Sequence, residues 1–275
     1  MSSSEPLDIK NYIGLTGDTP IRFIASDVDG TLVNDAKSVD PEVVNAVRAA
    51  RESGIRVAIA SGRAWHEMDD VIAAMPCLRY FVCTNGAYVM DKEEQKELVH
   101  ISFNKTRAVD LVRKLITYGV FVEAYVKAEI FGQYPTVGNE TLQAERFFRP
   151  NIRPFILKTR TMVPDLLAHL ESLPEGPEKI QIFYGDERIR ERILADLRDD
   201  FQGAATDGKG RERFYDVLES SEGNLEFVLP HTTKGTAVEA LANHWGYTPD
   251  EVMTIGDSEN DLSMIRFAGA SVAMG

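Results

Sequence analysis

Short hydrophobic runs near the start of the chain lead into polar or acidic residues. The first run, at residues 21–25, is followed by the sequence SDVDGT, and the second, at 55–60, is followed by Ser-Gly-Arg. The third run, at 80–84, is followed by Asn-Gly. Runs of this length are typical of buried strands. We therefore predict three strands that each end in a polar turn.

The segments between these runs have apolar positions at helical spacing. The pair Asp40-Pro41 is typical of a helix start, and the helical pattern that follows it continues to Gly54. A second helix is predicted over residues 64–75. Strands that alternate with helices indicate a parallel sheet with helices on its faces.

From about residue 91 this alternation gives way to helices and paired short strands. A helical stripe ends at Gly119, and Pro150 and Pro154 indicate a loop. Elements of this kind are typical of a separate α+β module. The predicted strands of the module are 120–126, 129–134, 178–184, 213–218 and 225–229, and its further helices are 163–173 and 186–201.

The α/β pattern returns at Lys234. A helix over 236–245 precedes a strand over 252–255, which leads into the sequence DSEND and a helix over 262–267. We therefore predict an α/β fold, with a Rossmann-like parallel-sheet core that is split around an inserted α+β domain. The predicted core is 1–91 and 231–275, with 1–20 as an irregular N-terminal extension, and the inserted domain is 92–230.

Composition excludes several classes of protein. The 275 residues are 44% hydrophobic and 27% charged, which is ordinary for a soluble globular protein. A net charge of −13 argues against a nucleic-acid partner, which calls for a basic patch, and no apolar run is long enough to cross a membrane. The first ten residues do not resemble a signal peptide, and Cys77 and Cys83 form no CxxC pair. We expect a cytoplasmic protein with free thiols.

Carboxylates follow two of the predicted core strands. Asp27 and Asp29 are two apart on an extended backbone, so they point the same way at the end of the first strand, and Asp257 follows a later one. An ordinary Asp-Gly turn would explain Asp29 and Gly30 taken alone. However, the carboxyl ends of parallel strands share one edge of a sheet, where ligands bind. Three carboxylates at one place favour a divalent cation, and Mg²⁺ prefers such oxygens.

Donors for an anion are predicted at the same edge. Ser61 and Gly62 lie between a strand and a helix and can offer a hydroxyl and a backbone N–H. Lys234 lies at the start of a helix, where its ammonium can reach a phosphoryl oxygen. Arg63 is either a substrate contact or an ion-paired surface residue.

Four motifs occur in a characteristic order. They resemble the four motifs of the haloacid dehalogenase superfamily of phosphotransferases, and in this chain they read DVDGT, ASGR, the lysine of TTKGTAV, and GDSENDLSM. TNGAYVMD and AGASVAMG resemble its Cof-like subfamily, in which a large type IIB α/β cap is inserted between the second and third motifs. Relatives usually continue beyond the position of Gly275, so the resemblance implies either a further core segment or a short member.

The resemblance implies roles for individual residues. Asp27 would be the nucleophile, and Asp29 would be the general acid and base. Mg²⁺ would be held by Asp27, the backbone carbonyl of Asp29, and Asp257. Asp261 would support the metal site or Lys234. The phosphoryl oxygens would be bound by the Val28 amide, Ser61, Gly62, Lys234 and Asn260.

The implied activity is that of a Mg²⁺-dependent phosphatase. It would hydrolyse a small phosphorylated metabolite, such as a sugar phosphate or a cofactor phosphate, through an aspartyl-phosphate intermediate. A phosphosugar mutase and a non-catalytic protein that binds a phosphorylated ligand are the alternatives. No motif in the inserted domain indicates a particular substrate, and none indicates an oligomeric state.

Overall fold

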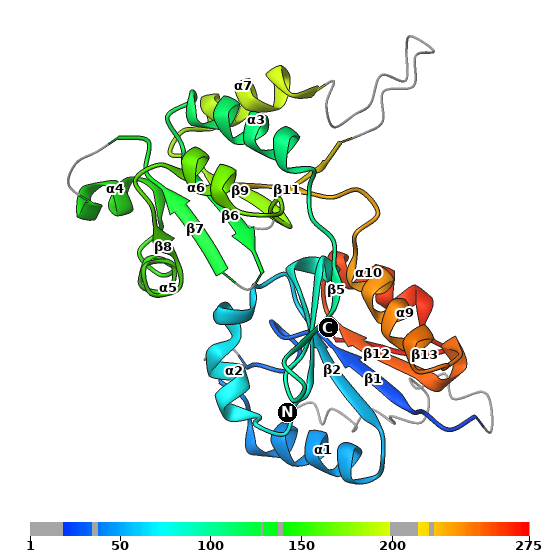
Figure 1. The fold of residues 1–275 in the computed structure, drawn as a ribbon. Coiled ribbons are helices and arrows are strands. Elements are labelled where there is room, and N and C mark those ends of the chain that lie inside the picture. The colour runs from blue at the N-terminus through cyan, green and yellow to red at the C-terminus, as the bar shows by residue number, and fades with distance from the viewer. Residues whose placement is uncertain are drawn as a thin grey trace, which may run out of the picture. The chain divides into compact units, whose positions relative to one another are not determined.

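The computed structural model describes residues 19–34, 38–127, 129–136, 140–198, 214–219 and 223–274. Residues 1–18 of the predicted extension, residue 213 of a predicted strand and residues 199–201 of a predicted helix lie outside these ranges. The chain forms two compact units (Figure 1). The core unit contains the described residues up to Arg63, Met68–Val99 and those from Thr233 onward, and the cap unit contains Ala64–Glu67 and His100–Thr232. That residues 92–230 fold as an inserted domain stays a prediction.

The core unit is built on a seven-stranded sheet with the order β13-β12-β1-β2-β3-β4-β5. Neighbouring strands from β13 to β3 are parallel, and β4 is antiparallel to β3. The predicted α/β class with a parallel sheet is confirmed. The strands are β1 (Phe23–Ser26), β2 (Arg56–Ala60), β3 (Tyr80–Cys83), β4 (Tyr88–Asp91), β5 (Lys96–His100), β12 (Val252–Gly256) and β13 (Ala270–Ala273).

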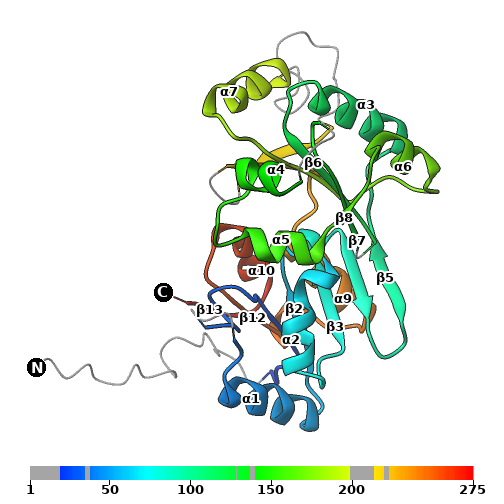
Figure 2. The ribbon, with the colours of Figure 1, turned by 90° about the vertical axis from the view of Figure 1, so that its left-hand side faces the viewer.

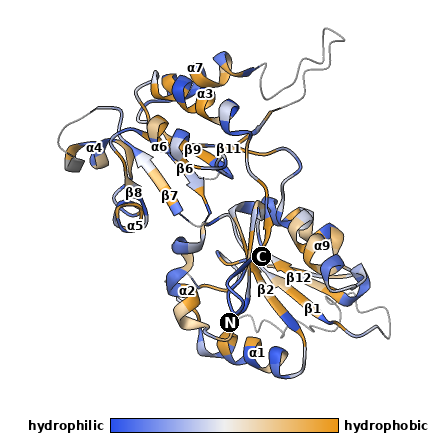
Figure 3. Cartoon of the chain, viewed as in Figure 1, coloured by the Kyte–Doolittle hydropathy of each residue, from blue (hydrophilic) through white to orange (hydrophobic). Residues whose placement is uncertain are grey.

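Helices cover both faces of this sheet. Helices α1 (Pro41–Glu52) and α2 (Asp69–Ala74) lie on one face, and α9 (Lys234–His244) and α10 (Leu262–Phe267) lie on the other (Figure 1). The strands β1, β2 and β12 are mostly hydrophobic (Figure 3), as expected for strands buried on both faces. Short 3₁₀ turns complete the unit: η3 (Thr84–Gly86), η4 (Pro249–Glu251) and η5 (Glu259–Asp261).

The cap unit contains a six-stranded sheet with the order β10-β11-β9-β6-β7-β8. Its neighbouring strands are antiparallel, except that β8 is parallel to β7. The strands are β6 (Phe121–Val126), β7 (Glu129–Gln133), β8 (Thr161–Met162), β9 (Lys179–Phe183), β10 (Asp216–Leu218) and β11 (Asn224–Val228). The helical elements are η2 (Trp65–Met68), of which Trp65–Glu67 belong to this unit, α3 (Lys105–Ile116), α4 (Glu140–Phe147), α5 (Arg153–Thr159), α6 (Leu166–Ser172) and α7 (Glu187–Asp196) (Figure 2).

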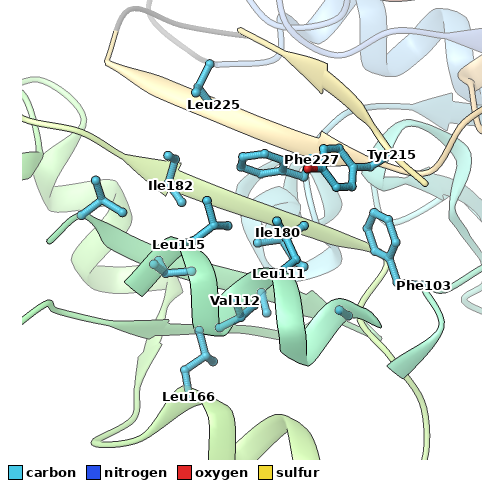
Figure 4. Packing of buried hydrophobic residues seen from close by; sticks show 14 of the residues in the cluster. Phe103, Leu111, Val112, Leu115, Leu166, Ile180, Ile182, Tyr215, Leu225 and Phe227 are labelled. Atoms are coloured by element: carbon cyan, nitrogen blue, oxygen red, sulfur yellow. The ribbon is translucent and has the colours of Figure 1, made fainter. Parts of the chain in front are cut away.

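One face of the cap sheet carries its main hydrophobic core. Leu111, Val112 and Leu115 of α3 lie over Ile180 and Ile182 of β9 (Figure 4). The two isoleucines alternate along β9 with the polar residues Lys179 and Gln181, as expected for a strand whose two faces differ in polarity. The apolar face is therefore fixed by helices, and the polar side chains of the same strand point to the opposite face.

The prediction of a loop around Pro154 is wrong. Helix α5 contains this proline in its first turn, where the missing N–H needs no partner and the fixed φ suits a helix.

The second face of the cap sheet carries a smaller aromatic cluster that includes Phe121, Phe148 and Phe183. Phe148 thus belongs to the core of the cap.

Candidate active site

Three of the predicted site residues directly follow neighbouring parallel strands of the core sheet. Asp27 follows β1, Ser61 follows β2 and Asp257 follows β12. The strands β12, β1 and β2 are adjacent and parallel, so their carboxyl ends share one edge. Asn85 lies at the same edge, in η3 after β3. This edge is where open α/β sheets bind ligands.

A buried ion pair lies at the centre of the site. The Nζ of Lys234 is 2.6 Å from Oδ1 of Asp27 and 2.7 Å from Oδ1 of Asp261. It also lies 3.5 Å from Oδ1 of Asn260. The Lys234 and Asp261 side chains are 1% and 0% exposed. A buried ammonium with two carboxylates is tightly held, since each charge would be costly alone.

Three carboxylates converge on one point. Oxygens of Asp27, Asp257 and Asp261 all lie within 4.8 Å of one another. Gly30 is needed for this approach: its φ is +80°, and a Cβ there would lie 2.2 Å from Oδ2 of Asp257. Lys234 provides one positive charge beside these three carboxylates, and the cluster suits an added cation. Its donors are all carboxylate oxygens, which fits Mg²⁺.

Electrostatics support this interpretation. Burial raises the pKa of Asp27 from its ordinary value of 3.8 to about 6, while Lys234 lowers it and Asp261 raises it further. The raised value shows that Lys234 does not fully compensate for desolvation of the carboxylate. A bound divalent cation would favour the ionised form of Asp27.

Asp261 organises the turn that carries Asp257. Its Oδ2 accepts hydrogen bonds from the backbone amides of Asp257 and Ser258, both at 3.0 Å. Its Oδ1 accepts the bond from Lys234. One buried carboxylate therefore holds both the lysine and the turn that carries Asp257.

Arg63 holds the second predicted catalytic residue. Its Nε and Nη2 lie 2.8 and 2.5 Å from the two carboxylate oxygens of Asp29. The Arg63 backbone N–H donates to Oγ of Ser61 at 3.1 Å. Arg63 is therefore ion-paired with Asp29. Sequence reasoning had left this open, since nothing local to the sequence ASGR specifies a partner.

The predicted phosphate-binding residues lie around this centre. The Val28 amide donates to the Asp27 carboxylate. Asn260 donates from Nδ2 to Oδ1 of Asn85 at 3.2 Å, and a Cβ on Gly62 would lie 3.1 Å from that oxygen. Asn85 was expected at this edge, because Asn-Gly follows the third predicted strand, but it was given no role. In the structure its φ is 53°, a left-handed backbone conformation that asparagine tolerates well.

Comparison with known proteins identifies the family. A model of haloacid dehalogenase-like hydrolases matches residues 24–275. The chain belongs to this family. The resemblance predicted from the four motifs is confirmed.

Two phosphatases of Bacillus subtilis are similar in sequence to this protein over most of its length. Phosphatase YwpJ of Bacillus subtilis is 29% identical over 93% of this chain and 90% of its own. The 5-amino-6-(5-phospho-D-ribitylamino)uracil phosphatase YcsE of the same organism is 25% identical over 94% and 85%. A haloacid dehalogenase-like hydrolase from Bacteroides thetaiotaomicron has a similar structure, with a TM-score of 0.72, 23% identity, and coverage of 90% and 86%. The predicted reaction class, phosphatase, is confirmed.

Within the part of the chain that the structure describes, no helix combines the length and the hydrophobicity needed to span a bilayer.

Proposed function

We propose that the protein is a Mg²⁺-dependent phosphomonoesterase that hydrolyses a small phosphorylated metabolite through a phosphoryl group carried on Asp27. The observation that carries this proposal is the meeting of Asp27, Asp257 and Asp261 within 4.8 Å, with Lys234 2.6 Å from Asp27. The name of the relative YcsE, which specifies a phosphorylated ribitylaminouracil, supports a metabolite of this size.

In this proposal Asp27 acts as the nucleophile. Lys234 and the Val28 amide both bind its carboxylate, so the side chain has a fixed direction. Asp27 and Asp257 would hold Mg²⁺, which when bound neutralises the charge of the phosphoryl group and allows an anionic carboxylate to approach it. Attack by Asp27 divides hydrolysis into transfer to the enzyme and release to water.

In this proposal Asp29 acts as the general acid and base. It lies on the same turn as Asp27, so it can reach an oxygen bonded to the phosphorus that Asp27 attacks. It would give a proton to the leaving oxygen and later take one from the attacking water. Arg63 holds the Asp29 carboxylate through both oxygens and so limits its orientations.

The remaining side chains of the site offer donors to the phosphoryl oxygens. Lys234 supplies an ammonium, Ser61 a hydroxyl and Gly62 a backbone N–H. Asn260 lies 3.5 Å from the lysine Nζ, so it belongs to the same group of contacts. Phosphoryl transfer depends mainly on such positioning and charge stabilisation.

The setting proposed for this activity is the cytoplasm. Cys77 and Cys83 do not form a disulfide with each other, which fits a reducing compartment. We propose a small-molecule substrate rather than a nucleic acid, because the chain carries a net charge of −13.

The test is phosphate release from a panel of phosphomonoesters that includes sugar phosphates and cofactor phosphates. We expect turnover with Mg²⁺ and none after EDTA treatment, and recovery when Mg²⁺ is restored. Asp27→Asn should abolish turnover, whereas the same change at the exposed Asp110 of α3 should leave it intact. Beryllofluoride with Mg²⁺ should be found on the Asp27 carboxylate in a crystal structure.

Three results would contradict the proposal. Full activity of Asp27→Asn would remove Asp27 as the nucleophile. An isomeric sugar phosphate formed without inorganic phosphate would identify a mutase. Binding of phosphorylated compounds by the Mg²⁺-loaded protein, without release of phosphate from any of them, would identify a non-catalytic binder.

A further inference from the structure

A four-residue segment after Arg63 belongs to the cap unit, although both of its chain neighbours belong to the core unit. Ala64–Glu67 groups with the cap by its contacts, while Arg63 and Met68 group with the core. Ala64 packs in a buried cluster with Tyr125 of β6 and Ile130 of β7. The segment therefore begins one peptide bond after the arginine that holds Asp29.

The Glu67 carboxylate makes two different contacts within this segment and with the cap. Its Oε2 accepts a hydrogen bond from the backbone N–H of Ala64 at 2.8 Å. Its Oε1 lies 2.5 Å from Nη1 of Arg160. The Glu67 side chain is 6% exposed, so both contacts are shielded from water. One carboxylate thus joins the Arg63–Ala64 peptide group to a cap arginine.

Arg160 is itself held firmly by the cap sheet. Its Nε and Nη2 lie 3.0 and 3.1 Å from the two oxygens of Glu123, and Nη2 donates to the Tyr125 hydroxyl at 3.1 Å. The Arg160 and Glu123 side chains are 3% and 0% exposed. A guanidinium bound on several sides has one orientation available, so it presents Nη1 to Glu67 in a fixed place.

The other end of this chain of contacts reaches the catalytic groups. Glu67 binds the N–H of the Arg63–Ala64 peptide group. The carbonyl oxygen of the same peptide group, that of Arg63, accepts a hydrogen bond from the Thr84 amide at 2.9 Å. The Arg63 amide donates to Ser61 Oγ, and its guanidinium holds Asp29. The backbone of Arg63 is therefore fixed on both sides, and Glu67 supplies one of those constraints.

Stability alone does not account for this arrangement. Burying ions costs several kcal/mol for each one, and a well-packed apolar replacement for a buried ion pair is often neutral or stabilising by roughly 1–4 kcal/mol. A role in fixing geometry would account for the retained charges.

We propose that Glu67 is a positioning residue for the general acid and base, acting on Asp29 through Arg63, and that Arg160 fixes Glu67. This inference rests on the proposed function of Asp29. Without Glu67 the Arg63 backbone gains freedom, and the Asp29 carboxylate loses its alignment with the leaving oxygen. The defect should therefore be largest for substrates whose leaving group requires a proton.

The test compares two substrates in Glu67→Gln, which keeps the shape of the side chain but retains only one acceptor oxygen. p-Nitrophenyl phosphate has a good leaving group that needs little protonation, whereas glycerol 2-phosphate has an alkoxide leaving group. General acid catalysis is worth roughly 10²–10⁴-fold, so a partial misalignment should lower kcat/KM for glycerol 2-phosphate about tenfold and that for p-nitrophenyl phosphate less than about twofold.

The matched control is Glu226→Gln. Glu226 is another buried carboxylate of the cap sheet, but it pairs with Lys179 at 3.4 Å. This variant should keep the wild-type ratio of the two kcat/KM values. Arg160→Lys, which keeps the charge but offers fewer donors, should give a ratio between those of wild type and Glu67→Gln. It also serves as the second variant if Glu67→Gln does not fold, as judged by circular dichroism and thermal melting.

The outcomes separate the inference from the proposed function. If wild-type protein releases no phosphate from any ester with Mg²⁺, the proposed function fails. If wild type is active and folded Glu67→Gln lowers kcat/KM equally for both substrates, or if Glu226→Gln changes the ratio as much, Glu67 has only a structural role and the inference is overturned.

Discussion

Asp27→Asn should make the metal-free protein more stable relative to wild type as the pH rises. In the folded chain, burial raises the pKa of Asp27 from 3.8 to about 6. The protonated form of this side chain therefore suits the folded state better than the ionised form does. A carboxyl whose pKa is higher in the folded than in the unfolded state stabilises the fold most at pH values below its unfolded-state pKa. That contribution is lost as the pH rises through its folded-state pKa.

The size of the effect follows from the two pKa values. The difference between 3.8 and about 6 corresponds to about 3 kcal/mol, at 1.36 kcal/mol for each pH unit. Most of it develops between about pH 4 and about pH 6.5, where the unfolded carboxyl has ionised and the folded one has not fully done so. Asparagine does not ionise, and Lys234 still has Asp261 as a partner at 2.7 Å in the variant.

The assay is urea denaturation of wild type and Asp27→Asn in EDTA, at a series of pH values from about 4 to about 8. The quantity of interest is the difference in unfolding free energy between the two proteins at each pH. We expect this difference to shift in favour of the variant by up to about 3 kcal/mol across the series. Titrating groups remote from Asp27 behave alike in both proteins, so they cancel in the difference, and Lys234 and Asp261 contribute through their coupling to Asp27.

A difference that stays constant with pH would show that the Asp27 carboxyl titrates alike in the folded and unfolded chains. A shift in favour of wild type would mean that Lys234 more than compensates for burial. Either result would remove the electrostatic reason for expecting a cation beside Asp27.

Three further changes test other parts of the site. Saturating Mg²⁺ should raise the melting temperature of wild type, by linkage between binding and folding, and this rise should be largely lost in Asp257→Asn when both are followed by scanning calorimetry. Lys234→Met leaves Asp27 and Asp261 buried without their ammonium, so chemical denaturation at pH 7 should show a loss of about 3–5 kcal/mol; a loss below about 1 kcal/mol would contradict the buried ion pair. Gly30→Ala places a Cβ against Asp257 in a left-handed backbone, so isothermal titration should show Mg²⁺ affinity reduced by roughly tenfold or more, and an unchanged affinity would place the metal elsewhere.

The core sheet was predictable because its signals are local and its geometry follows a general rule. Apolar runs marked β1, β2, β3 and β12, and parallel strands bring their carboxyl ends to one edge. That rule placed Asp27 and Asp257 together although they are far apart in the sequence, and the structure brings their oxygens within 4.8 Å. β5 was not predicted, since it contains exposed Lys96 and Glu97 and lacks a continuous apolar run.

The contacts that orient the site were not predictable in the same way. Arg63 could have faced solvent or substrate, and only the fold shows that its guanidinium meets both oxygens of Asp29. The pair Glu67 and Arg160 is separated by 93 positions, and neither residue lies in a distinctive pattern. Long-range ion pairs of this kind depend on the packing of whole elements, which periodicity does not specify.

The cap sheet shows why charge is a poor guide to exposure in this protein. Along β9, apolar Ile180 and Ile182 alternate with Lys179 and Gln181, a pattern that indicates one buried face and one that faces water. In the structure the polar face is buried as well: Lys179 is 2% exposed, and Glu226 on the neighbouring β11 is 6% exposed. Buried ions are costly to desolvate, so a role in positioning other groups would explain their arrangement. The two contacts of Glu67 provide such an explanation for Arg160. They connect Arg160, through the Arg63–Ala64 peptide group, to the arginine that holds Asp29.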